Sequence, residues 1–256
     1  MLAIKEKNQR ASAKIEKFAR YEFKYILNVR QREDIETEVR HFMTYDGHVH
    51  AELDNSYIVR SLYFDNVLAH HYYEKTDGIK TRHKFRLRTY ARSYEENTPL
   101  YLEKKGRHNQ RTYKRRVAIS LEELEMVTSA GQHDDLYKRF RDLDLVEQFL
   151  FETIRRNIQP VVLIDYQRRP YTSAFDTEFR LTFDSVLTAL AANELFPAAT
   201  TTKYSCLEGK TILEVKFLRR IPAWFHRIIQ AHDMTRLSIS KFCVGMETCG
   251  LATNLE

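Results

Sequence analysis

Polar and apolar residues alternate with a period of two in six segments of this chain, and the polar positions are mostly Arg and Lys. In the clearest segment, residues 82–88, four cations alternate with three other residues: Arg82, Lys84, Arg86 and Arg88 against His83, Phe85 and Leu87. A β-strand directs successive side chains to opposite faces, so this pattern predicts a strand with one cationic and one apolar face.

The same alternation recurs at residues 20–25, 102–107, 166–168, 178–184 and 213–217. One such strand alone is more often a solvated sheet face, because antiparallel sheets commonly have one wet side. Six strands rich in Arg favour a different interpretation, since the guanidinium group is suited to bidentate phosphate recognition. The pattern therefore indicates a phosphate-rich ligand. The few acids recur in Glu-x-Lys pairs, which suggests a divalent cation beside the anion; the pairs are Glu22/Lys24, Glu103/Lys105 and Glu214/Lys216.

Further along the chain the pattern predicts strands and helices in a mixed order. Strands are expected at 20–27, 57–64, 81–90, 100–106, 111–118, 161–168, 178–184 and 211–217. Helices are expected at 31–43, from the capping box Ser120/Glu123, at 134–157, after Pro222, and after Ser238 or Ser240. Residues 1–17 are polar and are interpreted as a flexible or helical arm. With seven Gly, five Pro and no linker-like stretch, residues 1–256 are predicted to form one domain.

These elements predict an α+β fold built on a mostly antiparallel sheet. A sheet with one ionic and one apolar face can stay open with one side wet, or it can close on itself. About eight strands give a closed barrel an interior wide enough for one ligand. We expect closure into an antiparallel β-tunnel with a basic lumen and with the helices packed outside.

Composition narrows the class of protein. Hydrophobic residues make up 43% of the chain, which supports a packed core, and the formal net charge of +6 suits nucleic acid, an anionic membrane or a small polyanion. The cysteines Cys206, Cys243 and Cys249 form no CxxC pair, which is typical of a reducing compartment. The N-terminus resembles no signal peptide, and no apolar run approaches the length of a membrane span. We therefore expect a cytoplasmic protein without a membrane span.

An ordered set of short motifs resembles one family. The motifs are Arg20–Tyr25 (RYEFKY), Val59–Asp65 (VRSLYFD), Lys84–Arg88 (KFRLR), Leu102–Lys105 (LEKK), Tyr113–Arg116 (YKRR), Pro160–Arg169 (PVVLIDYQRR), Phe179–Asp184 (FRLTFD), Ile212–Lys216 (ILEVK) and Ser240–Phe242 (SKF). Together they are similar to the VTC domain, the polyphosphate polymerase branch of the CYTH or triphosphate-tunnel superfamily. That superfamily has an antiparallel tunnel with a basic lumen, which agrees with the period-two pattern.

The resemblance implies transfer of the γ-phosphate of ATP onto a growing inorganic polyphosphate chain, with Mn²⁺ or Mg²⁺ as cofactor. ATP and polyphosphate or pyrophosphate are the implied partners, and no nucleic acid is expected. The resemblance implies catalytic roles for Lys24, Arg86, Arg88, Lys216 and Lys241. It implies phosphate-binding roles for Arg60, Lys84, Lys105, Lys114, Arg116, Arg168 and Arg180. Glu214 matches the family's metal ligand, with Glu22 and Glu103 as further candidate ligands.

One departure from the superfamily pattern bears on the reaction. Hydrolytic tunnel enzymes typically open with Glu-x-Glu-x-Lys, whereas this chain has Arg20 in the first position, which favours binding of a longer polyanion. Two alternatives stay open: a tunnel triphosphatase acting on inorganic or organic triphosphate, and a non-catalytic polyphosphate- or RNA-binding module. A histidine metal site at His70-His71 is a weaker interpretation, because no Cys or Asp partner accompanies the pair.

Overall fold

The computed structural model describes residues 16–46, 49–95, 97–129, 131–140, 143–173 and 175–254, with the backbone alone for residues 16–19. The strands are β1 (Glu16–Leu27), β2 (Thr44–Tyr45), β3 (Tyr57–Asp65), β4 (Thr81–Thr89), β5 (Leu100–His108), β6 (Arg111–Ile119), β7 (Gln159–Thr172), β8 (Arg180–Ala191), β9 (Tyr204–Ser205) and β10 (Thr211–Phe217). The helices are α2 (Val29–Val39), α3 (His70–Thr76), α4 (Leu121–Thr128), α5 (His133–Arg139), α6 (Asp144–Arg156), α7 (Ala223–Ala231) and α8 (Lys241–Thr248), with a 3₁₀ turn at Ala51–Leu53.

Eight of these strands close into an antiparallel barrel. The order around it is β7-β3-β4-β5-β6-β1-β10-β8, and a further pairing of β8 with β7 closes the ring. The short strands β2 and β9 extend the sheet at its margins. The predicted α+β fold with a closed antiparallel tunnel is therefore confirmed.

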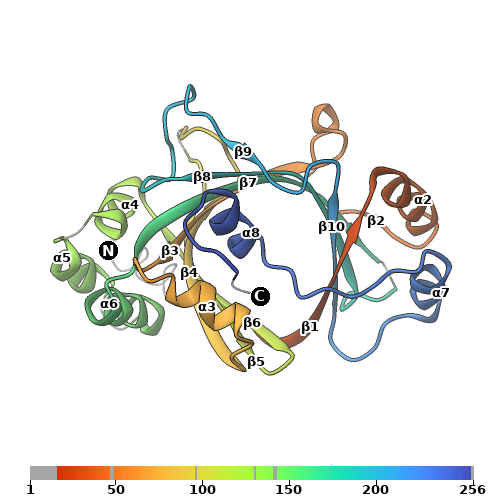
Figure 1. Cartoon of the computed structure of the whole chain (residues 1–256), viewed down its shortest axis with the longest axis horizontal. Coiled ribbons are helices and arrows are strands. Elements are labelled where there is room, and N and C mark those ends of the chain that lie inside the picture. Colours follow the sequence, from red (N-terminus) through yellow and green to blue (C-terminus); the bar gives the residue numbers. More distant parts are fainter. Residues whose placement is uncertain are drawn as a thin grey trace, which may run out of the picture.

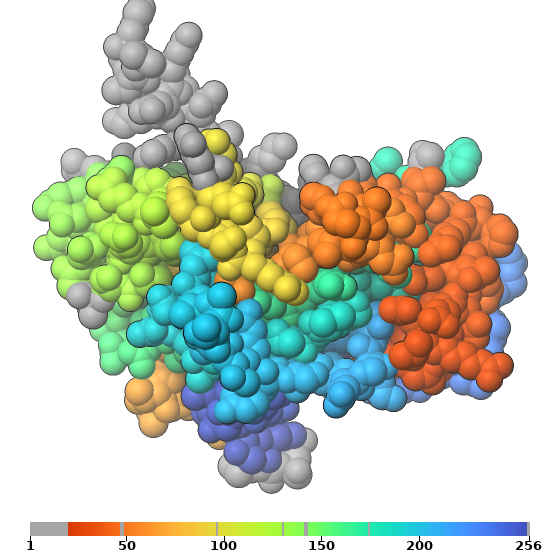
Figure 2. Space-filling view, turned by 90° about the horizontal axis from the view of Figure 1, so that it is seen from above, coloured from red at the N-terminus to blue at the C-terminus, as the bar shows by residue number. Residues whose placement is uncertain are grey.

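Two apolar clusters on the outside of the barrel carry most of the helices. Phe85, Leu87 and Leu102 point outward and pack with α4, α5 and α6. Leu213 and Val215 point outward from β10 and pack with α2 and α7. These helix groups lie at opposite ends of the molecule, as the green and red-orange surfaces in Figure 2 show. The outward positions are the apolar ones of the period-two pattern, so burying them forces the charged positions inward.

A third apolar cluster lies on the inner side of the barrel wall, which differs from the expectation that all helices pack outside. The register places Tyr63 opposite Val162 and Ser61 opposite Ile164, so these residues share the inward face. Helix α8 packs on them and is drawn within the ring of strands in Figure 1. Gly245 permits this approach, because a Cβ atom there would lie 2.7 Å from Cδ1 of Ile164. Part of the tunnel is thus filled by a helix, and the remainder is ionic.

Several boundaries differ from the predicted ones. The helix expected at 134–157 is two helices, α5 and α6, and α3 was not among the expected helices. Ser120 and Glu123 form the expected capping box, and Ser240 caps α8. The arm expected at residues 1–17 lies outside the described residues up to residue 15, and β1 begins at Glu16. Within the described residues, no helix has both the length and the apolar character needed to cross a bilayer.

Candidate functional site

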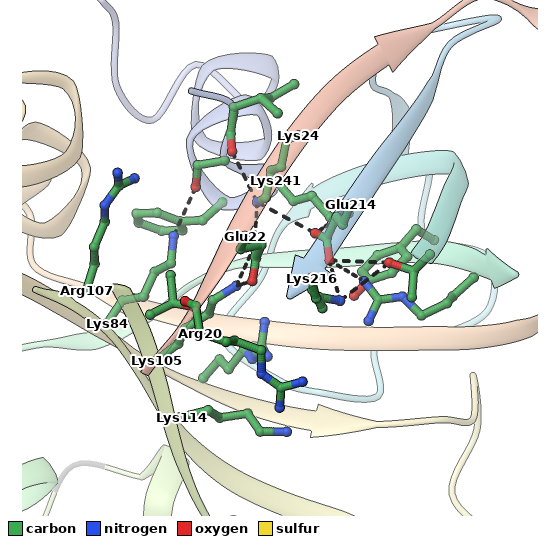
Figure 3. Close-up of a pocket in the computed structure, with 18 of the residues that line it drawn as sticks. Arg20, Glu22, Lys24, Lys84, Lys105, Arg107, Lys114, Glu214, Lys216 and Lys241 are labelled. Carbon is green, nitrogen blue, oxygen red and sulfur yellow. Dashed lines mark hydrogen bonds and ion pairs between the residues drawn. The ribbon is translucent and has the colours of Figure 1, made fainter. Parts of the chain in front are cut away.

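A cavity of about 620 Å³ occupies the ionic part of the tunnel. Its walls come from strands around the barrel and from the loop leading into α8, and Figure 3 shows charged side chains from these elements pointing into one space. The cations that line it are Arg20, Lys24, Lys75, Arg82, Lys84, Arg86, Arg88, Lys105, Arg107, Lys114, Arg168, Arg180, Lys216, Arg236 and Lys241. The carboxylates that line it are Glu22, Asp46 and Glu214.

Strand register brings like charges together on this wall. Lys105 on β5 lies opposite Lys84 on β4 and opposite Lys114 on β6, which makes a row of three lysines across neighbouring strands. Lys216 on β10 likewise lies opposite Arg180 on β8. Like charges directly opposite each other destabilise a sheet. An anionic ligand would relieve that repulsion.

Glu214 is the centre of the ion pairs on the other wall. Its carboxylate lies 2.8 Å from Nζ of Lys216, 2.8 Å from Nζ of Lys241 and 3.1 Å from Nη2 of Arg168, with Nζ of Lys24 at 3.6 Å. Burial raises the pKa of Glu214, but these cations outweigh it and hold the pKa well below the usual range. Glu214 therefore stays ionised inside the tunnel.

Glu22 forms a second, linked group. Its carboxylate lies 3.1 Å from Nζ of Lys105 and 3.3 Å from Nζ of Lys24, the same ammonium that approaches Glu214. Burial raises the pKa of Glu22, yet the lysines lower it more, to below its usual range. The two carboxylates thus flank one ammonium group, as Figure 3 shows.

Lys84 has a different environment from the other lysines. Its ammonium donates to Oγ of Ser240 at 2.9 Å and lies over the rings of Phe242 and Tyr63. Burial lowers its pKa from 10.5 to about 8. Burial also lowers the pKa of Lys216 to about 8, even though Glu214 opposes the shift. An anion entering the cavity would favour the charged form of both side chains and raise these pKa values again.

Sequence comparison places this architecture in a family. The model of the VTC domain matches residues 19–249, which is most of the chain. This chain belongs to the VTC domain family. The resemblance predicted from the motifs is therefore confirmed.

Other comparisons are more distant. No curated protein matches the chain. Among solved structures, the PH1819 protein from Pyrococcus horikoshii OT3 is 14% identical, with a TM-score of 0.45 over 89% of this chain and 98% of that one. A Bacillus halodurans protein described as a candidate adenylate cyclase is 9% identical, with a TM-score of 0.46 over 86% of this chain and 92% of that one.

Most of the site residues predicted for this VTC domain line the cavity. They are Glu22, Lys24, Lys84, Arg86, Arg88, Lys105, Lys114, Arg168, Arg180, Glu214, Lys216 and Lys241. Arg88 contacts mainly neutral groups, with Oγ of Ser61 at 3.3 Å and the hydroxyl of Tyr166 at 3.2 Å. Arg168 instead binds both oxygens of Asp184, at 2.7 and 2.6 Å.

Three predicted residues do not line the cavity. Arg60 points to the outer side of β3, where Nε and Nη2 bind the two oxygens of Asp165 at 2.9 and 2.8 Å. The prediction is wrong in placing Arg60 in the lumen, because Ser61 and Tyr63 hold the inward positions of this strand. Arg116 lies over the ring of Tyr101, 4.7 Å from its centroid. Glu103 lies on the same face of β5 as Lys105, but it is fully buried and Arg86 binds one of its oxygens.

The donors on the cavity wall fit the divalent cation that the VTC resemblance implies. Glu22 and Glu214 offer carboxylate oxygens, the ligands that Mg²⁺ and Mn²⁺ prefer, and both approach the same point near Lys24. Phosphate oxygens of a substrate would complete such a shell, so few protein ligands are needed. Glu103 is a poorer ligand, since releasing it would leave Arg86 without its buried carboxylate partner.

Some site residues were missed at the sequence level. Arg236 and the turn that follows α7 reach the cavity, although this segment carries no periodic pattern. Tyr63 also lies outside any alternating pattern, yet its hydroxyl accepts a hydrogen bond from Nη1 of Arg86 at 2.9 Å. Apart from Glu22 and Glu214, the described residues contain one group of three side chains with closely spaced metal-ligating atoms: His71, His83 and Glu152. The pair His70-His71 was the signal for it, and its partners come from distant segments.

Proposed function

We propose that this VTC domain is a metal-dependent polyphosphate polymerase, which transfers the γ-phosphate of ATP onto a growing inorganic polyphosphate chain. One observation carries the proposal: the row of opposed lysines Lys84, Lys105 and Lys114 along a cavity of about 620 Å³. Such a row matches a linear polyanion, whose charges repeat along its length.

The proposed reaction needs positioning and charge neutralisation more than covalent catalysis. A terminal phosphate oxygen of the acceptor attacks the γ-phosphorus, the bond to the β–γ bridging oxygen breaks, and ADP leaves. The attacking oxygen is already anionic, so no general base is required. Five cations would stabilise the charge on the transferred group: Lys24, Arg86, Arg88, Lys216 and Lys241. The remaining lining cations would hold the triphosphate of ATP and the polyphosphate acceptor in line.

The acidic pair has a defined part in this proposal. Glu22 and Glu214 would hold the Mn²⁺ or Mg²⁺ ion, which neutralises phosphate charge when bound. In the free protein Glu214 holds Lys216 and Lys241 in place at 2.8 Å each. The carboxylate therefore orients these two ammonium groups before the substrate arrives. A substrate phosphate would then compete with Glu214 for them.

Incubation of the purified protein with ATP and Mn²⁺ tests the proposal. We expect long chains on a polyphosphate-stained gel, in amounts that follow the ADP released. Arg88→Ala should lower the rate at least about tenfold, because a charge-assisted contact to phosphate is lost. Arg115→Ala is the matched control, since Arg115 lies on the outer face of β6 and pairs with Asp144.

The two alternatives give different products in the same assay. A tunnel triphosphatase would release orthophosphate from ATP or inorganic triphosphate and leave no chains on the gel. A binding module would retain polyphosphate on the protein and turn over neither substrate. Either result would overturn the polymerase proposal.

A further inference from the structure

A second set of chemically reactive side chains lies on the outer side of β4, away from Glu22 and Glu214. His83 of β4, His71 of α3 and Glu152 of α6 meet there. One ligating atom from each lies within 4.8 Å of the other two. The side chain of His71 is fully buried, that of Glu152 is 10% exposed and that of His83 is 21% exposed. Three separate elements thus bring two imidazoles and a carboxylate to one point.

Both histidines of this group offer a ring nitrogen that has no hydrogen-bond partner among the described residues. The two atoms are Nε2 of His71 and Nε2 of His83, and each is buried. Nε2 of His83 lies 3.5 Å from Oε1 of Glu152, which is too long for a good hydrogen bond. Buried polar atoms almost always have a partner, so two unsatisfied imidazole nitrogens beside one carboxylate need an explanation.

We propose that His71, His83 and Glu152 form a binding site for a zinc ion. Two imidazoles and one carboxylate are a common zinc ligand set, with bonds of about 2.0–2.2 Å and tetrahedral geometry. In that geometry two ligand atoms stand roughly 3.3–3.5 Å apart, which is the separation between His83 and Glu152. Nitrogen donors select zinc over the Mg²⁺ or Mn²⁺ that the carboxylates Glu22 and Glu214 suit.

The surroundings of the group orient its ligands. Nδ1 of His71 lies 3.4 Å from the carbonyl oxygen of Phe64 and 3.8 Å from the carboxylate of Asp65, which leaves Nε2 for the metal. Nη1 of Arg156 lies 3.2 Å from Oε2 of Glu152, so Oε1 is the oxygen nearer His83. Burial lowers the pKa of both imidazoles, and neutral imidazole is the metal-binding form.

A zinc ion at this site would have a structural consequence. His71 and His83 also line the tunnel cavity, so the site adjoins it. A bound zinc ion would connect α3 and α6 through β4, the strand that carries Lys84, Arg86 and Arg88. The zinc site therefore fixes two helices beside the phosphate-binding wall. Zinc binding at this site is independent of the proposed polymerase reaction.

Zinc binding by the untagged full chain tests the site. Metal is removed from the protein with a chelator, and the protein is titrated with Zn²⁺ in excess Mg²⁺. The Mg²⁺ occupies the carboxylates Glu22 and Glu214. We expect one equivalent to bind and the melting temperature to rise with zinc concentration. Co²⁺ in place of Zn²⁺ should give the intense visible absorption of a four-coordinate site. His83→Ala/Glu152→Gln should weaken zinc binding at least about 100-fold and abolish the zinc-dependent rise in melting temperature.

His108→Ala is the matched control, because His108 is an exposed histidine at the end of β5 whose side chain bonds only to Thr81 among the described residues. It should bind zinc like the wild type. Glu152→Gln alone preserves side-chain shape, so its circular dichroism separates loss of a ligand from loss of the fold. Absence of a saturable equivalent in the wild type, or an unchanged affinity in the folded double variant, would overturn the assignment.

Discussion

Arg86 and Glu103 form a buried ion pair across β4 and β5, with Nε and Nη2 of the arginine 2.8 and 2.6 Å from the same carboxylate oxygen. The register of the two strands places these residues opposite each other. Burial raises the pKa of Glu103, but Arg86 and Arg88 lower it by more, so the pKa lies below its usual range and the carboxylate stays ionised. Arg86 is therefore held in position by the sheet before any anion binds.

Arg86→Ala should destabilise the protein as well as weaken phosphate binding. The substitution leaves Glu103 as a buried carboxylate that has lost its closest partner, which typically costs about 3–5 kcal/mol. Urea denaturation should therefore show a lower free energy of unfolding by about that amount. Arg86→Met/Glu103→Leu should recover more than half of the loss, because neither charge remains buried.

Lys80→Ala is the control for that measurement, since Lys80 is an exposed cation directly before β4. Its effect should stay within about 0.5 kcal/mol. A similar, small effect for Arg86→Ala would show that the ion pair contributes nothing to folding.

The sequence predicted the barrel because six of its segments repeat one simple rule. Phe85 and Leu87 alternate with Lys84 and Arg86, and a period of two has only one inward and one outward face. The strand at 57–65 carries no such alternation: every residue from Val59 to Asp65 is buried. This is why Arg60 was assigned to the wrong face.

Pairing between segments could not be predicted from either segment alone. Glu103 was counted as a candidate metal ligand, yet only the β4–β5 register reveals that Arg86 occupies it. The zinc ligands lie on α3, β4 and α6, and folding alone brings Glu152 to His83. Helix α8 has apolar residues like any other helix, and only the fold reveals that it lies inside the barrel, with Gly245 against Ile164.

Arg60→Ala should lower stability without changing anion affinity. Arg60 pairs with Asp165 on the outer face and does not line the cavity. Removing it leaves Asp165 with Lys203 as its remaining ion-pair partner among the described residues, so we expect a loss of a few kcal/mol in denaturant unfolding, up to about 3–5. Calorimetry with tripolyphosphate, at a temperature where both proteins are folded, should give equal dissociation constants within about twofold.

Lys105→Ala is the opposite case, because Lys105 lies at the centre of the lysine row. Its affinity for tripolyphosphate should fall at least about tenfold. If Arg60→Ala weakens binding as much as Lys105→Ala does, the outward assignment of Arg60 cannot stand.

Glu214→Gln should separate metal binding from anion binding. The variant loses a proposed metal ligand, so metal-dependent turnover should be lost. The lost carboxylate is also one that four cations approach within 3.6 Å. Without metal, tripolyphosphate should bind more tightly, by about 1 kcal/mol or roughly fivefold, because a negative charge has left the cavity. Turnover against Mn²⁺ concentration and metal-free calorimetry measure the two effects. Glu122→Gln, an exposed carboxylate on α4, should change neither. An unchanged Mn²⁺ curve for Glu214→Gln would exclude Glu214 as a ligand.

Anion affinity should fall as the pH rises above about 8, and Lys84 supplies part of that fall. Burial lowers the pKa of Lys84 to about 8 in the folded protein, from 10.5 in an ordinary lysine. The charged form is thus disfavoured by folding, so this residue lowers stability below about pH 8, and that penalty fades as the pH rises towards 10.5. Phosphate binding needs the charged form, so affinity and stability change in opposite directions over this range.

Lys84→Arg tests that account, because arginine stays charged throughout the range. A plot of log Kd for tripolyphosphate against pH should have a slope smaller by up to one proton in the variant than in the wild type above about pH 8. Lys216, with a pKa also of about 8, should keep the remaining slope in the variant. Burial raises the pKa of Tyr63, but its neighbouring cations lower it to about 7, so Tyr63 titrates in both proteins and its effect largely cancels in the comparison. Identical slopes in the two proteins would mean that Lys84 does not contact the anion.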